Sequence, residues 1–281
     1  MWLLVVIAVV LLLVLLMRRR RRQRFQMTPP DDWQRDVVYL YMFKRAMTKG
    51  VVNLSPFAIK LETWLRLHKI KYEPIETLKF SPKRGQIPYV WLNGEWLEES
   101  NLIIVRLAEY FNIKETDGLT DEQVGVCRAF TKMVEEHTAV TIFLYRYAQH
   151  VEEFSRVFQL SDKPIRNFMF RKTMKIGFSF RAYLQGLGRN TREQNAEIAK
   201  EDIRALSLYL GDKRYFMGDK ITSVDCSIFG VLSQVAFVDM NYPHKDPLRE
   251  ECSNLQQYLI RIQETLWPDW HLLCDVDGKF H

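Results

Sequence analysis

The sequence predicts a membrane helix, then an α/β part, then an all-helical part, and three observations support this order. Residues 1–17 form an uncharged apolar run. Strand and helix patterns alternate through residues 37–112, whereas only long helical patterns fill residues 119–271. Because apolar residues recur about every 2 residues in a half-buried strand and every 3.6 in a helix, we expect an α/β domain followed by an all-α domain.

The apolar run at the N-terminus has the composition of a membrane span, since residues 1–17 are almost entirely Leu, Val, Ile and Ala. As a helix they would extend about 25 Å, the lower limit for a bilayer core. A cleaved signal peptide would carry its positive charge before the apolar run. A buried core helix would not end in the five consecutive arginines of residues 18–22. We therefore expect a transmembrane anchor at 1–17 and a basic juxtamembrane tether at 18–36.

The charge distribution predicts an orientation for this anchor. The chain has a net charge of +6, and residues 1–24 contain six arginines and no acid, so the remainder is balanced. The excess charge therefore gives no reason to expect nucleic-acid binding. By the positive-inside rule, the N-terminus lies outside or in a lumen and the later domains lie in the cytosol. Residues 1–24 would contact the membrane. Arg18–Arg22 would attract anionic lipids or serve only as a stop-transfer signal.

The α/β part begins with two predicted strands joined by a helix. Residues 37–43 form an apolar, β-branched run typical of a buried strand, and residues 72–77 suit a second strand. Between them, Ser55-Pro56 marks a helix start, because serine can cap free amides and proline tolerates the first helical position. We expect this helix to end near His68.

A hairpin and another helix complete the α/β part. Residues 85–92 are expected to form a strand, Asn93-Gly94 is the strongest two-residue hairpin signal, and residues 95–98 return. A helix then occupies residues 99–111. A parallel strand pair joined by a helix and followed by an antiparallel hairpin is the thioredoxin-like arrangement.

Several short motifs resemble those of glutathione transferases. They are the Ser55-Pro56-Phe57 turn, the Gln86-Ile87-Pro88 cis-proline loop, the Glu99-Ser100-x-x-Ile103 signature and the Thr222-x-x-Asp225 capping box of the helical domain. The resemblance implies a glutathione-transferase-like fold, with a thioredoxin-fold domain at 37–112 and a helical domain at 119–271. Together with the anchor inferred above from hydropathy, the predicted fold is this domain pair preceded by one transmembrane helix.

Longer strings are similar to one family, and on them the chain is identified as a member of the failed axon connections family. These strings are Thr131–His137, Leu210–Gly218 and Trp267–His271. The family includes cadmium-responsive proteins of nematodes and is related to metaxins. The resemblance implies a role in axon development or metal-stress response, and a homodimer or a metaxin-like partner.

The same resemblance implies a glutathione site. A glutathione transferase lowers the pKa of the glutathione thiol, so that the thiolate can attack an electrophile. Ser55, at the positive end of a helix dipole, would be the catalytic hydroxyl that activates the thiol. The backbone of Ile87, next to Pro88, would pair with the cysteinyl unit. Glu99 would hold the ammonium and Ser100 the carboxylate of the γ-glutamyl end, with glutathione as ligand or co-substrate.

Structural explanations compete with each of these roles. Ser55 and Ser100 can be plain helix caps, and Pro88 can serve the fold alone. Our leading hypothesis is a membrane-anchored glutathione-transferase-like protein that acts through glutathione or through partners. An active transferase and a metaxin-like docking or import component are the alternatives.

We expect no metal site. His137 lies beside two glutamates, but the spacing matches no known ligand set, so we interpret it as a helix-face histidine. The cysteines are far apart and form no C-x-x-C pair, which argues against zinc and disulfides. They are Cys127, Cys226, Cys252 and Cys274.

Overall fold

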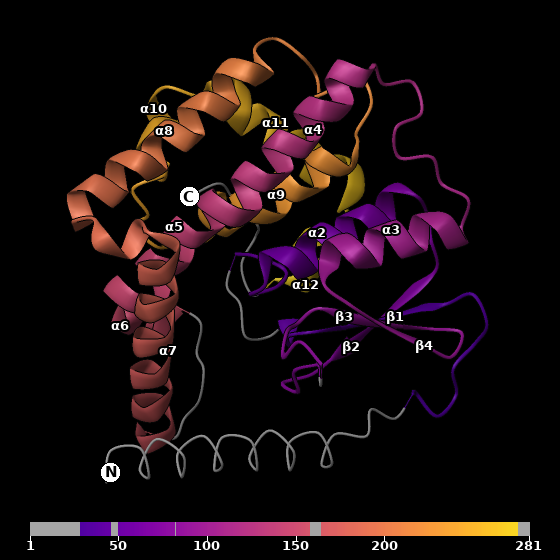
Figure 1. The fold of residues 1–281 in the computed structure, drawn as a ribbon, viewed down its shortest axis with the longest axis horizontal. Coiled ribbons are helices and arrows are strands. Elements are labelled where there is room, and N and C mark those ends of the chain that lie inside the picture. The colour runs from indigo at the N-terminus through magenta and orange to yellow at the C-terminus, as the bar shows by residue number, and fades with distance from the viewer. Residues whose placement is uncertain (1–28, 46–49, 82, 158–163, 275–281) are drawn as a thin grey trace, which may run out of the picture.

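The computed structural model describes residues 29–45, 50–81, 83–157 and 164–274. A small sheet lies at one side of the molecule, two helices cover one of its faces, and a larger group of helices stacks beyond them (Figure 1). The predicted order of strand, helix, strand, hairpin and helix in the α/β part is confirmed.

Four strands form the sheet in the order β2-β1-β3-β4. They are β1 (Val38–Met42), β2 (Tyr72–Glu76), β3 (Tyr89–Leu92) and β4 (Glu95–Glu98). β1 and β2 are parallel, whereas β3 is antiparallel to both β1 and β4. Tyr41 pairs with Tyr89, and Tyr89 pairs with Glu98. The ends of β1 and β4 and the start of β3 therefore meet at one end of the sheet.

Helix α2 (Pro56–Leu67) lies between the sheet and the helical part. Leu61 and Trp64, on one face of α2, belong to the hydrophobic core that α2 shares with the sheet. Ile59 belongs to the larger hydrophobic core of the helical part. Helix α9 (Ser223–Ala236) approaches α2 closely at Gly230, where an added Cβ would lie 2.6 Å from the carbonyl oxygen of Pro56. Glycine is therefore required at this crossing.

Helix α3 (Ser100–Tyr110) covers the same face of the sheet as α2 (Figure 1). The remaining elements are α4 (Asp121–Met133), η2 (Val134–Thr138), α5 (Ala139–Phe143), η3 (Leu144–Gln149), α6 (Val151–Val157), α7 (Pro164–Gln185), η4 (Leu187–Arg189), α8 (Arg192–Leu210), α10 (Lys245–Glu250), α11 (Ser253–Leu266) and α12 (Trp270–Leu273).

Helix α9 is the centre of the helical part, and all of its residues after the first are buried. Its predicted capping box is present. The carboxylate of Asp225 accepts hydrogen bonds from the amide of Thr222 at 2.7 Å and from its hydroxyl at 2.8 Å. It also accepts from the hydroxyl of Tyr258 at 3.0 Å, which joins α9 to α11.

The long helical pattern of residues 121–150 does not form one continuous α-helix. Two π-helical segments, η2 and η3, interrupt it on either side of α5. A π turn contains one extra residue, so it rotates the side chains that follow and brings different residues inward.

The transmembrane helix is a correction to the predicted fold. Among the described residues no helix is both long and apolar enough to cross a bilayer, and the longest, α7, carries four cations between residues 171 and 181. The predicted anchor at 1–17, the membrane contacts of 1–24 and the lipid contacts of Arg18–Arg22 lie outside the described residues. We correct the fold class to an α/β domain plus an all-α domain. The single-pass membrane localisation, with a lumenal N-terminus and cytosolic domains, depended on that helix and is withdrawn with it.

Candidate functional site

The residues that resemble a glutathione site meet at one end of the sheet. Ser55 caps α2, which follows β1, while Ile87 and Pro88 precede β3, and Glu99 follows β4. The strand register puts the start of β3 beside the end of β4, and therefore Pro88 near Glu99. The Ile87–Pro88 peptide bond is cis, and the hydroxyl of Ser55 lies 3.5 Å from the carbonyl oxygen of Ile87.

Ser55 is buried and makes two hydrogen bonds through its hydroxyl. The oxygen accepts from the amide of Ala58 at 3.3 Å, which caps α2, and the proton is donated to Ile87 across 3.5 Å. The second bond is at the limit of hydrogen-bond length, so a better acceptor could replace it. The amide of Ser55 donates to the side chain of Asn53 at 3.0 Å, and Asn53 is held in turn by Gln234 of α9.

The loop before the cis-proline is attached to β4 by a carboxylate that the sequence motifs do not indicate. Glu98 accepts from the hydroxyl of Ser81 at 2.7 Å and from the amide of Arg84 at 2.8 Å. The hydroxyl of Ser81 also accepts from the amide of Gln86 at 3.2 Å. Glu98 thus holds the loop next to Glu99, which is the N-cap residue of α3.

Glu99 caps its own helix in a backbone conformation unusual for its type. Its φ is 78°, in the left-handed region that favours glycine. One carboxylate oxygen accepts from the amide of Asn101 at 3.0 Å and the other from that of Leu102 at 3.1 Å. Ser100 begins α3 and is buried. Strained residues of this kind cluster at ligand sites, so the conformation supports a functional hypothesis for Glu99.

A buried polar network connects Glu99 to the helical part, and sequence reasoning missed it. The ammonium of Lys60 lies 2.5 Å from Glu135 and 2.7 Å from the side-chain oxygen of Asn101. The amide group of Asn101 donates to Glu135 at 2.7 Å and to Glu99 at 3.2 Å. Ser227 of α9 donates to Glu135 at 2.9 Å. The only sequence signal was a lysine among the apolar residues of α2.

The network determines where negative charge remains. Lys60 neutralises Glu135, because their charged atoms are in contact and both side chains are buried. Within the described residues, Glu99 is linked to them through the uncharged amide of Asn101. The unbalanced negative charge therefore lies at Glu99, the partly exposed end of the network, where it can attract a cation.

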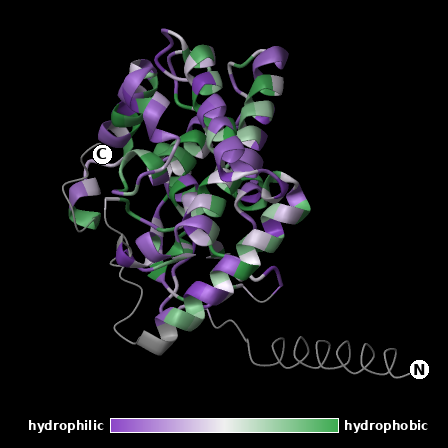
Figure 2. Cartoon of the chain, turned by 90° about the vertical axis from the view of Figure 1, so that its left-hand side faces the viewer, coloured by the Kyte–Doolittle hydropathy of each residue, from purple (hydrophilic) through white to green (hydrophobic). Residues whose placement is uncertain are grey.

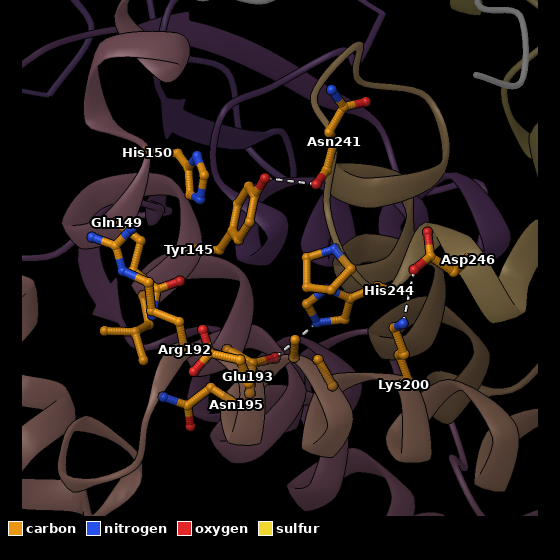
Figure 3. A pocket seen from close by; sticks show the side chains of 15 residues that line it. Tyr145, Gln149, His150, Arg192, Glu193, Asn195, Lys200, Asn241, His244 and Asp246 are labelled. Atoms are coloured by element: carbon orange, nitrogen blue, oxygen red, sulfur yellow. Dashed lines mark hydrogen bonds and ion pairs between the residues drawn. The ribbon is translucent and has the colours of Figure 1, made fainter.

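Two cavities in the described part lie elsewhere. One, of about 380 Å³, is lined by η3, the start of α8 and residues 241–246 (Figure 3). Its wall includes His244, whose Nε2 lies 2.8 Å from the hydroxyl of Thr141. Burial lowers the pKa of His244 to about 3, so the ring is neutral, and its Nδ1 has no partner among the described residues. The other, of about 320 Å³, lies at the start of α9.

One histidine and four cysteines were also considered from the sequence. His137 contacts Asp202 at 2.8 Å, and the described residues contain no group of three His, Cys, Asp or Glu side chains placed to hold a metal. Burial raises the pKa of Cys127 to about 11 and that of Cys226 well above its ordinary value, so both thiols are protonated at neutral pH.

Comparison with known proteins agrees with the fold. Residues 56–153 match the glutathione S-transferase N-terminal domain, and residues 199–262 match the glutathione S-transferase C-terminal domain. A glutathione transferase from Phanerochaete chrysosporium superimposes with a TM-score of 0.56, at 13% identity over 82% of this chain and 97% of that one. A glutathione S-transferase from Methylobacterium radiotolerans, solved with glutathione sulfonate, gives 0.51 at 14% identity, over 83% and 94%. The fold is therefore that of the glutathione transferases.

Proteins that are similar in sequence indicate a narrower group within the glutathione-transferase fold. Failed axon connections of Drosophila melanogaster is 34% identical over 86% of this chain. The isoprene-epoxide–glutathione S-transferase of a Rhodococcus strain is 28% identical over 76% of this chain and 94% of its own length. A Metaxin-2 homolog of Caenorhabditis elegans is 24% identical over 73% and 89%. These matches relate the chain to the failed axon connections family, and it spans 61% of the length of the Drosophila protein.

Proposed function

We propose that the protein binds glutathione where the starts of α2 and α3 and the cis-proline loop meet. The observation that carries this proposal is that the strand register puts Pro88 and Glu99 at the same end of the sheet, where the hydroxyl of Ser55 lies 3.5 Å from the carbonyl oxygen of Ile87. Support comes from the solved relative whose structure contains glutathione sulfonate. Glutathione is a peptide with an ammonium, a thiol and two carboxylates, and each of the first two has a suitable partner here.

The ammonium of the γ-glutamyl end would lie against Glu99. This carboxylate holds the unbalanced charge of the buried network and is partly exposed. Ser100, at the first position of α3, would receive the γ-glutamyl carboxylate near the positive end of the helix dipole. The backbone of Ile87 would pair with the cysteinyl unit beside Pro88.

The sulfur would lie next to Ser55. Its hydroxyl makes a long bond to the carbonyl of Ile87, and a thiolate, being charged, is the stronger acceptor. Together with the first amides of α2, the hydroxyl would stabilise the thiolate and lower the thiol pKa. The reaction that this arrangement supports is addition of the thiolate to an electrophile. The name of the Rhodococcus relative makes small epoxides the first substrates to test.

We further propose, from the relationship to Failed axon connections, that the protein serves in the formation of axon connections. A role in metal stress would act through the bound thiol.

A second candidate function is that of a docking component, which we infer from the similarity to the Metaxin-2 homolog. One observation favours it: Ser55 and Glu99 already cap their own helices, so both have a structural role without any ligand.

Calorimetry with the full chain distinguishes these functions. Glutathione is compared with glutaryl-cysteinylglycine, which lacks only the ammonium. We expect glutathione to bind at least tenfold more tightly, and Glu99→Gln to remove this difference. Glu95→Gln, at an exposed carboxylate at the start of β4, should keep it. Absence of heat at millimolar glutathione would contradict the binding proposal and favour the docking component.

A further inference from the structure

Helix α7 is apolar on two opposite sides. One side packs against the body of the protein through Phe170, Met174 and Phe178, which are partly buried against the helical core. The other side presents large apolar side chains to solvent, with exposed fractions of 57% for Met169 and 68% for Ile176. A helix that packs through one face alone is normally polar on the other, so the second apolar face has no role in the fold described here.

The exposed face has the spacing of a coiled-coil seam. Met169, Thr173, Ile176, Phe180 and Tyr183 follow one another at intervals of four, three, four and three residues, and all five are exposed. We name these five residues the α7 seam. This alternation is that of positions d and a in a heptad repeat, which face a second helix. The hydroxyl of Thr173 donates to the carbonyl of Met169 at 2.8 Å, so the seam contains no unsatisfied hydroxyl.

The charges around the seam all have one sign. Residues 164–185 contain five basic residues and no acid. Lys172 lies within the exposed apolar surface, with its ammonium 5.0 Å from the centre of the Phe168 ring. Lys175 and Arg181 are also exposed. A surface that is apolar in the middle and basic around it is complementary to one that is apolar and acidic.

Helix α7 lies outside the two regions that match the domain models. The helix lies between residue 153, where one matched domain ends, and residue 199, where the other begins. It runs along the edge of the molecule, away from the sheet (Figure 1), and apolar and polar residues alternate along it (Figure 2). Its 22 residues are about 33 Å long, enough for three heptads.

We infer that the α7 seam is a docking surface for an acidic amphipathic helix of a partner protein. This goes beyond the proposed glutathione binding and does not depend on it. A second copy is a poor occupant, because it would bring an equally basic helix against this one. A lipid surface would also suit the basic rim, but it does not account for the heptad spacing of the seam, which is that of a contact between two helices.

A designed peptide tests the inference on the full chain. The probe is a 21-residue helix with leucine at positions a and d and glutamate at e and g, and its matched control carries lysine for each glutamate. We expect the glutamate peptide to bind at least tenfold more tightly than the lysine peptide at low salt, with the difference shrinking as salt is added.

Two double variants locate the binding. Ile176→Ser/Phe180→Ser should weaken the glutamate peptide at least tenfold. Leu208→Ser/Leu272→Ser, at residues 83% and 75% exposed on other helices, should leave it unchanged. Circular dichroism checks that both variants fold.

Other outcomes would overturn the inference. The first is that the glutamate peptide does not bind. The second is that the two peptides bind with equal affinity. The third is that the seam variant, Ile176→Ser/Phe180→Ser, binds the glutamate peptide as tightly as the native protein does. Binding to phosphatidylserine vesicles that only the seam variant loses would identify a lipid surface instead. A dimer in sedimentation that only the seam variant loses would identify a second copy.

Discussion

The ammonium of Lys60 and the carboxylate of Glu135 are in contact at 2.5 Å, although they lie 75 residues apart in the chain. The two side chains are only 3% and 4% exposed. Removing two charges from water is costly, and the cost is offset here because Asn101 and Ser227 complete the hydrogen bonds of the pair. The contact thus joins α2 to η2, and Asn101 connects it to Glu99.

Removing one member of this pair should destabilise the protein strongly. Lys60→Met leaves Glu135 buried without its counter-charge, which we expect to lower the free energy of unfolding by about 3–5 kcal/mol in urea denaturation. Lys60→Met/Glu135→Gln removes both charges and keeps an acceptor for Ser227, so it should recover a large part of the loss. A double variant no more stable than Lys60→Met would argue against this account.

Ser55→Ala should separate binding from catalysis. The variant loses the hydroxyl beside the proposed sulfur position, so we expect glutathione to bind in calorimetry while conjugation of an epoxide is abolished. It should also lose about 1 kcal/mol of stability, because the cap on Ala58 is removed. Ser55→Thr, which keeps a hydroxyl, is the control. Turnover by Ser55→Ala at the rate of the native protein would leave the residue only its capping role.

Gly230→Ala should reduce stability through a backbone clash. The added methyl would lie 2.6 Å from the carbonyl oxygen of Pro56, and backbone atoms cannot move aside cheaply. We expect a loss of about 1–3 kcal/mol in thermal unfolding. Gly177→Ala on α7 is the matched control, since nothing lies within 4 Å of its new methyl. This second change should stabilise the protein by up to about 1 kcal/mol. Equal effects of the two changes would be inconsistent with a close crossing of α2 and α9.

His244 should make stability depend on pH below neutrality. Burial lowers its folded-state pKa from 6.5 to about 3, so between these values the unfolded chain binds a proton that the folded chain does not. Stability should therefore fall as pH decreases from about 6.5 toward 3, by up to about 1.4 kcal/mol per pH unit from this residue. Urea denaturation at pH 7, 6 and 5 measures the slope. His244→Gln should show a smaller slope, whatever its stability at pH 7, and an unchanged slope would exclude His244 as the cause.

Local patterns predicted several turns and helix starts well. The Asn93-Gly94 hairpin, the cap at Ser55 and the box at Thr222 each depend on a few neighbouring residues, and each is present. The cis bond before Pro88 followed from a motif. The domain limits at 37–112 and 119–271, and the ligand roles of the site residues, stay predictions.

What could not be predicted depends on distant partners or on small irregularities. The π turns within residues 121–150 were not predicted from the sequence, yet η2 carries Glu135, which contacts Lys60. The motif around Glu99 indicates a helix start, but not that its carboxylate occupies the first amides of that helix. The membrane helix was inferred from hydropathy in residues 1–17, whereas the described helices are amphipathic or buried within the body.

The place of α2 between two cores has a consequence for gene fusions and domain exchange. Nine of its twelve residues are buried, and they include Ile59, which belongs to the helical core, and Lys60, which needs Glu135. A recombinant fragment that ended near residue 112 would expose that apolar side and leave the lysine without its counter-charge. The glutathione-transferase-like halves of this chain are therefore not interchangeable parts, and a chimera should exchange α2 and α9 together.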